Sequence, residues 1–297
     1  MIHFKSLSSL YRACHLPSPE HPLLGLFSFH SPTTVFSDHL SSFTGDFYLI
    51  GLKKIRAGKM FYGRTNYDHQ NGTMSFIKPG QVVELKDVEW EESGFVIAFH
   101  KDFLLGHSLY AAIRNYGFFD YEVDEALHIS EKEERLMWEL YHKIEQEYGN
   151  NQDEFSQSIM VTHIDAILKY ANRYYKRQFR NRSNFTSHLL SQFNTILYQK
   201  LANYESDLPT VNEIAGQMHL SPRYLSDLLK YETGKTAIEH IHMGLIDEAK
   251  HLLLKSDTNI SETAYKLGFG HPTYFSRLFK QKVGMSPKEF RKRHIVN

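Results

Sequence analysis

The chain has 297 residues, more than one hydrophobic core usually organises, so two domains of roughly 100 to 200 residues each are expected. Hydrophobic residues make up 41% and charged residues 23%, a composition typical of globular proteins and not of disordered or collagen-like ones. The single cysteine, Cys14, excludes an internal disulfide and multi-cysteine zinc sites, and it favours a reducing, cytoplasmic location. No apolar run approaches 18 residues, so neither a membrane span nor a signal peptide is expected.

Positive and negative charges balance over the whole chain but not within its two parts. Residues 1–179 carry 18 Lys or Arg and 23 Asp or Glu, a net charge of −5. Residues 180–297 carry 16 and 11, a net charge of +5. Excess positive charge favours polyanionic partners through counterion release, but many solvated surfaces reach +5. The charge therefore permits nucleic-acid binding without establishing it.

The segment from Leu23 to Phe103 has the pattern of short strands separated by tight turns. It is rich in Phe, Tyr, Val and Ile. The turn signals are Gly45-Asp46, Ala57-Gly58, Asn71-Gly72 and Pro79-Gly80. Apolar and polar residues alternate in 47–55, where one face stays apolar until Lys53, and an apolar run occupies 94–99. This predicts a β-sandwich or β-barrel within a domain spanning residues 1–130.

The periodicity becomes helical after residue 130. Residues 131–148 place Leu136, Leu140 and Ile144 on one stripe, and Gly149-Asn150-Asn151 ends that helix. A second helix, 153–179, is expected to bury Ile159, His163, Ile164, Ile167, Leu168, Ala171, Tyr174 and Tyr175. The pair predicts an antiparallel hairpin over residues 131–180. Two interpretations stay open: the hairpin packs on the β-rich domain of its own chain, or it forms a homodimer interface.

Residues 181–186 are polar and read as a linker to a third segment, 181–297, in which every element is helical. Three start signals have the capping-box spacing, namely Thr210 with Glu213, Asn259 with Glu262 and Ser286 with Glu289. Pro222, Pro272 and Pro287 follow helix starts, and Gly234, Gly268 and Gly284 follow helix ends. The helices are expected at 189–205, 211–218, 222–232, 236–254, 260–267, 272–282 and 287–294.

This helical segment contains an internal repeat. Val211, Ala215, Met218 and Leu220 precede Ile260, Ala264, Leu267 and Phe269 by 49 residues, and Tyr224, Leu225, Ser226, Lys230 and Gly234 precede Tyr274, Phe275, Ser276, Lys280 and Gly284 by 50. Each copy is a short helix, a turn and a second helix, which is the helix-turn-helix pattern. Gly268 supplies the left-handed turn position that His219 occupies in the first copy.

Residues 188–294 resemble the DNA-binding domain of the AraC/XylS family of transcription regulators. The resemblance is densest in ISETAYKLGFGHPTYFSRLFKQKVGMSPKEFRK, which contains Gly268-Phe269, Tyr274-Phe275-Ser276-Arg277, Ser286-Pro287 and Phe290-Arg291 as the family pattern has them. The sequence departs from that pattern at Leu229, where Phe is usual, and at Gly244-Leu245, where Arg is common. The N-terminal part is similar, less specifically, to the sensor domain of the same regulators.

The resemblance implies an α+β protein: a β-barrel-like, cupin-like domain with a helical hairpin, followed by an all-α domain with two helix-turn-helix motifs. The 236–254 helix spans about 28 Å, so two recognition helices can enter successive major grooves of promoter DNA. The residues expected to face DNA are Pro222, Arg223, Ser226, Asp227, Lys230, His271, Pro272, Thr273, Ser276, Arg277 and Lys280. Tyr224, Leu225, Leu228, Phe275, Leu278 and Phe279 are expected in the core.

The remaining partners are less defined by the sequence. The N-terminal domain could bind a metal, a small-molecule effector or nothing, and it could serve effector sensing, homodimer formation or both. RNA polymerase is a further partner if the protein is an activator, and no residue pattern identifies an effector. Lys53, Lys54, Arg56, Lys59 and Arg64 form a basic cluster that suits either an anionic effector or a protected edge strand. His69 and His100 lie outside any metal-ligand pattern, so no metal or other cofactor is expected.

Two other classes of function compete with a regulator. A β-barrel enzyme is disfavoured because the sequence has no GxSxG, HExxH, P-loop or GxGxxG motif. A non-specific architectural DNA-binding protein would favour a larger basic excess and need no sensor domain. We therefore expect a sequence-specific regulator and not an enzyme.

Overall fold

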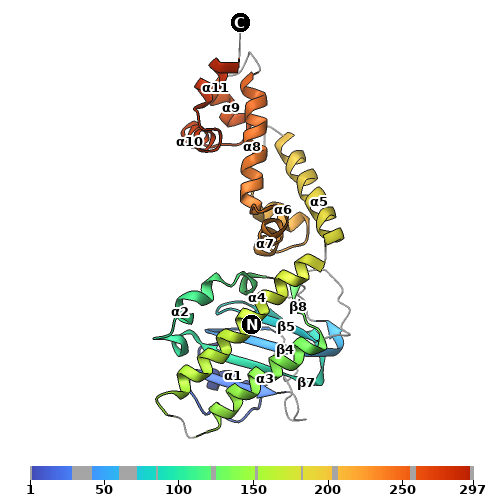
Figure 1. Cartoon of the computed structure of the whole chain (residues 1–297), viewed down its shortest axis with the longest axis vertical. Coiled ribbons are helices and arrows are strands. Elements are labelled where there is room, and N and C mark those ends of the chain that lie inside the picture. Colours follow the sequence, from blue (N-terminus) through green and yellow to red (C-terminus); the bar gives the residue numbers. More distant parts are fainter. Residues whose placement is uncertain are drawn as a thin grey trace. The chain divides into compact units, whose positions relative to one another are not determined.

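A computed structural model describes residues 2–28, 42–59, 72–84, 86–121, 125–150, 153–181, 183–202, 207–254 and 259–294. The chain divides into two compact units, Met1–Asn181 and Arg182–Asn297 (Figure 1). The first unit combines two sheets with helices, and the second is helical. This mixed α+β composition agrees with the fold class expected from the sequence. Within the described residues, no helix is long and apolar enough to cross a membrane.

The first unit contains a three-stranded and a five-stranded sheet. The smaller sheet has the order β1 (Ile2–Phe4), β3 (Ser42–Gly45), β6 (Val83–Glu84). The larger sheet has the order β2 (Leu24–Ser28), β7 (Lys86–His100), β4 (Phe47–Lys59), β5 (Thr73–Ile77), β8 (Leu127–His128), with antiparallel neighbours throughout. The described strands thus form two sheets and no closed barrel, so the predicted cupin-like barrel is not confirmed. The turn predicted at Ala57-Gly58 is wrong, because β4 continues to Lys59.

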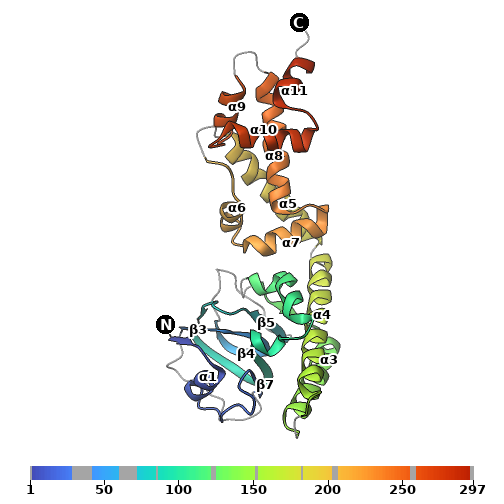
Figure 2. The same ribbon diagram turned by 90° about the vertical axis from the view of Figure 1, so that its left-hand side faces the viewer.

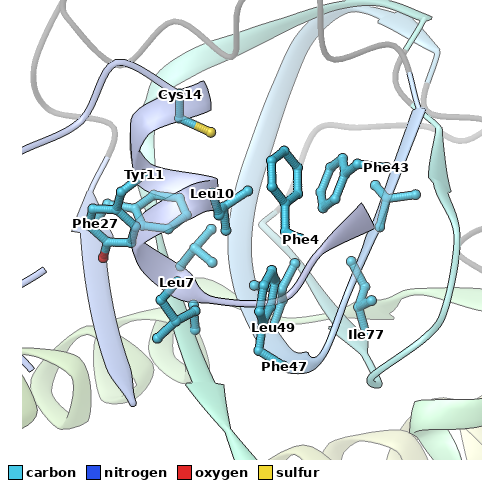
Figure 3. Packing of buried hydrophobic residues seen from close by; sticks show 13 residues of the cluster. Phe4, Leu7, Leu10, Tyr11, Cys14, Phe27, Phe43, Phe47, Leu49 and Ile77 are labelled. Carbon is cyan, nitrogen blue, oxygen red and sulfur yellow. The ribbon is translucent and has the colours of Figure 1, made fainter. Parts of the chain in front are cut away.

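A hydrophobic core lies between these sheets and the short helix α1 (Leu7–Ala13). Phe4 and Phe43 come from the smaller sheet, Phe27 and Leu49 from the larger one, and Leu10 from α1 (Figure 3). The opposite face of the larger sheet is also apolar, since Phe95, Ile97 and Phe99 alternate with the core residues Val96 and Ala98. A strand whose residues are all apolar requires cover on both faces, and two helices provide the second cover.

Those helices are α3 (Glu131–Tyr148) and α4 (Ser156–Asn181), which lie along the side of the larger sheet away from α1 (Figure 2). Tyr141 of α3 stacks on Phe95 with ring centroids 4.4 Å apart, and Tyr175 of α4 lies 6.3 Å from Phe76. The hairpin therefore packs on the β-rich part of its own chain, as one of the two interpretations held. This packing does not test self-association.

The buried stripe of the hairpin differs from the predicted one. In α3 the buried residues are Met137, Tyr141 and Ile144, whereas Leu136 and Leu140 are half-buried. In α4, Ile164, Ile167, Leu168, Ala171, Tyr174 and Tyr175 are buried as predicted, His163 is half-buried, and Ile159 is 39% exposed. The reason is that two large aromatic side chains of α3, Trp138 and Tyr141, pack against Phe95 of the sheet. The buried face of α3 is therefore displaced by about one residue from the predicted stripe.

Shorter elements connect the sheets to the hairpin. They are the 3₁₀ turns Lys101–Leu104, Ile113–Asn115 and Gly117–Asp120 and the helix α2 (Leu109–Ala112). His100 caps the first of these turns, because its Nδ1 accepts a hydrogen bond from the Asp102 amide at 3.2 Å. His69, Arg64 and the side chains of Lys54, Arg56 and Lys59 lie outside the described residues.

The second unit contains seven helices among its described residues. They are α5 (Ser183–Ala202), α6 (Val211–Gln217), α7 (Pro222–Thr233), α8 (Ala237–Leu254), α9 (Ile260–Lys266), α10 (Pro272–Val283) and α11 (Pro287–His294). The linker predicted at 181–186 is wrong for residues 183–186, which belong to α5. Polar residues there do not break the helix, because the buried positions from Leu189 to Leu201 anchor its remaining turns.

Candidate nucleic-acid interface

Both helix-turn-helix motifs begin with the predicted capping box. Thr210 Oγ1 accepts from the Glu213 amide at 3.2 Å, and Glu213 accepts from the Thr210 amide at 3.1 Å. Asn259 and Glu262 exchange the same two bonds at 2.8 and 3.0 Å. The backbone N–H of Thr210 lowers the pKa of Glu213, so the box is formed with a carboxylate. These caps fix where α6 and α9 start.

The turns between the paired helices also match. His219 has φ 55° in the first motif and Gly268 has φ 84° in the second, as the repeat predicted. A left-handed residue lets the chain reverse within a few residues. His219 is one of two non-glycine residues with positive φ in the described chain.

The recognition helices are oriented by burial of one face. The six core residues predicted from the repeat, Tyr224, Leu225, Leu228, Phe275, Leu278 and Phe279, are all at most 5% exposed. Both helices have proline at their first position and end at a left-handed glycine, Gly234 or Gly284. Because one face is buried and both ends are fixed, the opposite face of each helix is presented to solvent.

The eleven predicted DNA-facing residues all lie off the core. The exposed ones are Pro222, Arg223, Lys230, His271, Thr273, Arg277 and Lys280, and the half-buried ones are Ser226, Asp227, Pro272 and Ser276. In each motif these residues lie at the start of one helix and along its first three turns. Their contact with DNA stays a prediction.

The two motifs flank a shared helix. α7 lies near the start of α8 and α10 near its end (Figure 2). The 18 residues of α8 extend about 27 Å at 1.5 Å per residue, close to one 34 Å turn of DNA. At Gly244 an added Cβ would lie 3.0 Å from Leu201 and 3.2 Å from Leu197, so this glycine lets α5 pack closely on α8. That is the physical role of the residue at which the sequence departs from the family pattern.

The repeat did not predict three polar arrangements on this surface. Arg223 Nε donates to Asp227 Oδ2 at 3.1 Å. The Arg277 guanidinium carbon lies 5.8 Å from the centroid of the Tyr274 ring, which is 42% exposed. Arg291 Nε donates to the Leu253 carbonyl at 2.9 Å, capping the end of α8. The i to i+4 and i to i+3 spacings of the first two pairs were visible in the sequence and could have indicated them.

Comparisons with known proteins found a family model whose match lies within this unit. Residues 214–293 match the family model described as a helix-turn-helix domain. The transcriptional activator RhaS of Klebsiella pneumoniae is 37% identical over 79 residues, 27% of this chain and 28% of that protein. RhaS of Salmonella arizonae is 38% identical over 78 residues, 26% of this chain and 28% of that protein. The matched segments thus span less than a third of these curated relatives.

Solved structures of transcription-regulator domains also resemble part of this chain. The C-terminal domain of the response regulator AraT from Geobacillus stearothermophilus is 26% identical, with 36% of this chain and 88% of that chain covered and a TM-score of 0.33. The corresponding domain of YesN from Fusobacterium nucleatum is 24% identical, with coverages of 35% and 98% and a TM-score of 0.32. The duplicated motif and the family match together show that the C-terminal unit contains a helix-turn-helix domain of the AraC type, as the resemblance in sequence implied.

Proposed function

We propose that this chain is a sequence-specific DNA-binding transcription regulator in which α7 and α10 enter successive major grooves of one promoter duplex. The observation that carries the proposal is the pair of helix-turn-helix motifs with equivalent caps, turns and buried faces, joined by one helix about 27 Å long. The eleven outward residues then comprise the DNA-contact surface. The RhaS relatives are named transcriptional activators. If this protein also activates transcription, RNA polymerase is its further partner.

The decisive experiment measures sequence preference. Selection from a randomised duplex library with the full chain is expected to yield a bipartite site whose two halves lie about one helical turn apart. Binding to that site should exceed binding to scrambled duplexes by about 10³-fold or more at physiological salt. An architectural protein would instead enrich no sequence and would bind both duplexes equally.

We propose that the first unit supplies effector sensing. A cavity of about 20 Å³, room for about one water molecule, opens between the two sheets and is lined by apolar residues together with Lys53 and Ser75, so a larger ligand would have to displace these side chains. Gly51 leaves room for both, since an added Cβ would lie 3.0 Å from Ser75 Oγ and 3.1 Å from Lys53 Cε. An apolar pocket with a few convergent polar groups is the usual form of a small-molecule site.

Saturation-transfer NMR with small organic acids tests this role. Ligand signals are expected with the unmodified chain and should be lost with Gly51→Leu, whose larger side chain fills the pocket. Signals that persist unchanged with Gly51→Leu would contradict the role.

A further inference from the structure

Arg223 and Asp227, at the start of the first recognition helix, form a defined pair. Arg223 Nε donates to Asp227 Oδ2 at 3.1 Å, and the two residues are four apart on α7. The Arg223 side chain is 47% exposed and that of Asp227 is 26% exposed. A pair of this kind contributes only about 0.3 to 0.5 kcal/mol to helix stability. Its more important consequence is the orientation that it gives to the guanidinium group.

The bond uses only one of the five N–H donors of Arg223. Because the bond to Asp227 is made by Nε, the end of the guanidinium, where the two terminal nitrogens each carry an outward N–H, is left to form a second, two-pronged contact. Guanine presents two acceptors, O6 and N7, at its major-groove edge, and an arginine fork matches both. Holding the fork in place before binding reduces the side-chain entropy that is lost on contact.

The charges of α7 favour a base contact over a phosphate contact. α7 contains two basic residues, Arg223 and Lys230, and two acidic ones, Asp227 and Glu232. A phosphate bound by Arg223 would bring its negative charge close to the Asp227 carboxylate, whereas the neutral edge of guanine would not. The pair is therefore better suited to reading a base than to anchoring the backbone.

The second motif does not repeat this arrangement. Fifty residues after Arg223 and Asp227 stand Thr273 and Arg277, and α10 has three basic residues and no acidic one. Arg277 packs beside the Tyr274 ring instead of a carboxylate. Both helices begin with proline, end at a left-handed glycine and bury equivalent residues such as Leu225 and Phe275, but only α7 carries an arginine–carboxylate pair on its outward side.

We propose that Asp227 is a positioning residue that holds Arg223 for bidentate recognition of one guanine in the half-site read by α7. This inference rests on the proposed function and specifies how one half-site is read. Asp227 acts through Arg223, which differs from the direct contact to cytosine that an acidic residue could otherwise make.

The test is a double-mutant cycle on the selected DNA site, with the full chain. Arg223→Ala should weaken binding about 5- to 150-fold. In that variant, replacing the guanine that Arg223 contacts by 7-deazaguanine should not weaken binding any further. Asp227→Ala should also weaken cognate binding and reduce discrimination against the wrong base at that position. In the Arg223→Ala background, Asp227→Ala should have no effect on base preference.

Glu232→Ala is the matched control, because it removes the same charge from the exposed end of the same helix. It should leave base preference unchanged, and circular dichroism should show all variants folded. The proposal is overturned if Asp227→Ala strengthens binding equally on cognate and scrambled DNA, or if its effect persists without Arg223. It is also overturned if no guanine in the selected site depends on Arg223. If the unmodified chain selects no sequence at all, the proposed function itself fails.

Discussion

Lys53 shows how one polar residue can be placed, half-buried, at the border of a mainly apolar core. It follows Leu49 and Gly51 on the same face of β4, and that face meets the smaller sheet. Burial lowers the pKa of its ammonium group to about 8, and burial raises the pKa of the nearby Cys14 thiol to about 11. The sequence showed that the apolar alternation stops at Lys53. It did not show that Lys53 lies on the same, inward face of the strand as the apolar residues before it.

We predict that Lys53→Met stabilises the first unit at pH 7. A lysine whose pKa is lowered on folding opposes folding fully below pH 8, and this cost disappears as the pH rises from about 8 towards 10.5. The advantage of the variant should therefore shrink over that range. Denaturant unfolding followed by tryptophan fluorescence measures it, because both tryptophans, Trp90 and Trp138, belong to the first unit. An advantage independent of pH would contradict the role of the charge.

Arg277 is expected to anchor DNA and not to read it. It lies on a helix with three basic residues and no acidic one, and its guanidinium packs beside Tyr274. Arg277→Ala should weaken binding by a similar factor on cognate and scrambled duplexes and reduce the salt slope by about one. Arg277→Lys should restore most of the affinity, because a phosphate contact tolerates an ammonium group. A loss confined to cognate DNA would instead assign a base contact to Arg277.

At the scale of elements, the sequence predicted best what is encoded locally. The capping pairs Thr210 with Glu213 and Asn259 with Glu262 need only a four-residue segment, and the structure contains both. The predicted buried stripe of α3 was displaced by about one residue, because the face that α3 buries is decided by packing against Phe95, which is far away in the sequence. The start of α5 was missed because distant packing overrides the low helix propensity of residues 183–186.

Two helical glycines give opposite predictions for the same substitution. Gly216 in α6 has open space around an added Cβ, so Gly216→Ala should stabilise the second unit by up to about 1 kcal/mol. Gly244→Ala should destabilise it, because the new methyl group would lie 3.0 Å from Leu201 and 3.2 Å from Leu197. Thermal unfolding followed by circular dichroism compares them. Equal stabilisation by both would show that α5 does not pack closely on Gly244.

The helical hairpin exposes apolar side chains, although they are not the stripe predicted from the sequence. Ile144 is buried against the sheet, whereas Phe155 and Ile159 are 62% and 39% exposed. We propose that these two residues form part of a dimer interface, so that Phe155→Glu with Ile159→Glu should give folded monomers. Sedimentation velocity measures the change. An unmodified chain that is monomeric at tens of micromolar, an order of magnitude suited to weak dimers, would argue against the interface.

At the scale of the whole molecule, charge and structure divide the chain at nearly the same place. The net charge is −5 over residues 1–179 and +5 over residues 180–297, and the second compact unit begins at Arg182. The seven helices described between residues 183 and 294, and with them both motifs, lie in the positively charged part. A negatively charged first unit would add repulsion and not affinity towards DNA, so the DNA-binding free energy should come from the second unit.

We therefore predict that a fragment of residues 182–297 folds as a helical domain and selects the same DNA sequence as the full chain. Its affinity should be lower than that of the full chain if the first unit dimerises, because two linked domains bind adjacent sites with a higher effective concentration. On a duplex with one bipartite site, which one protein molecule occupies, the fragment and the full chain should bind with similar affinity. Circular dichroism and titrations on duplexes with one and two sites test both statements. A fragment that is folded but shows no preference for the selected sequence would mean that readout requires the first unit.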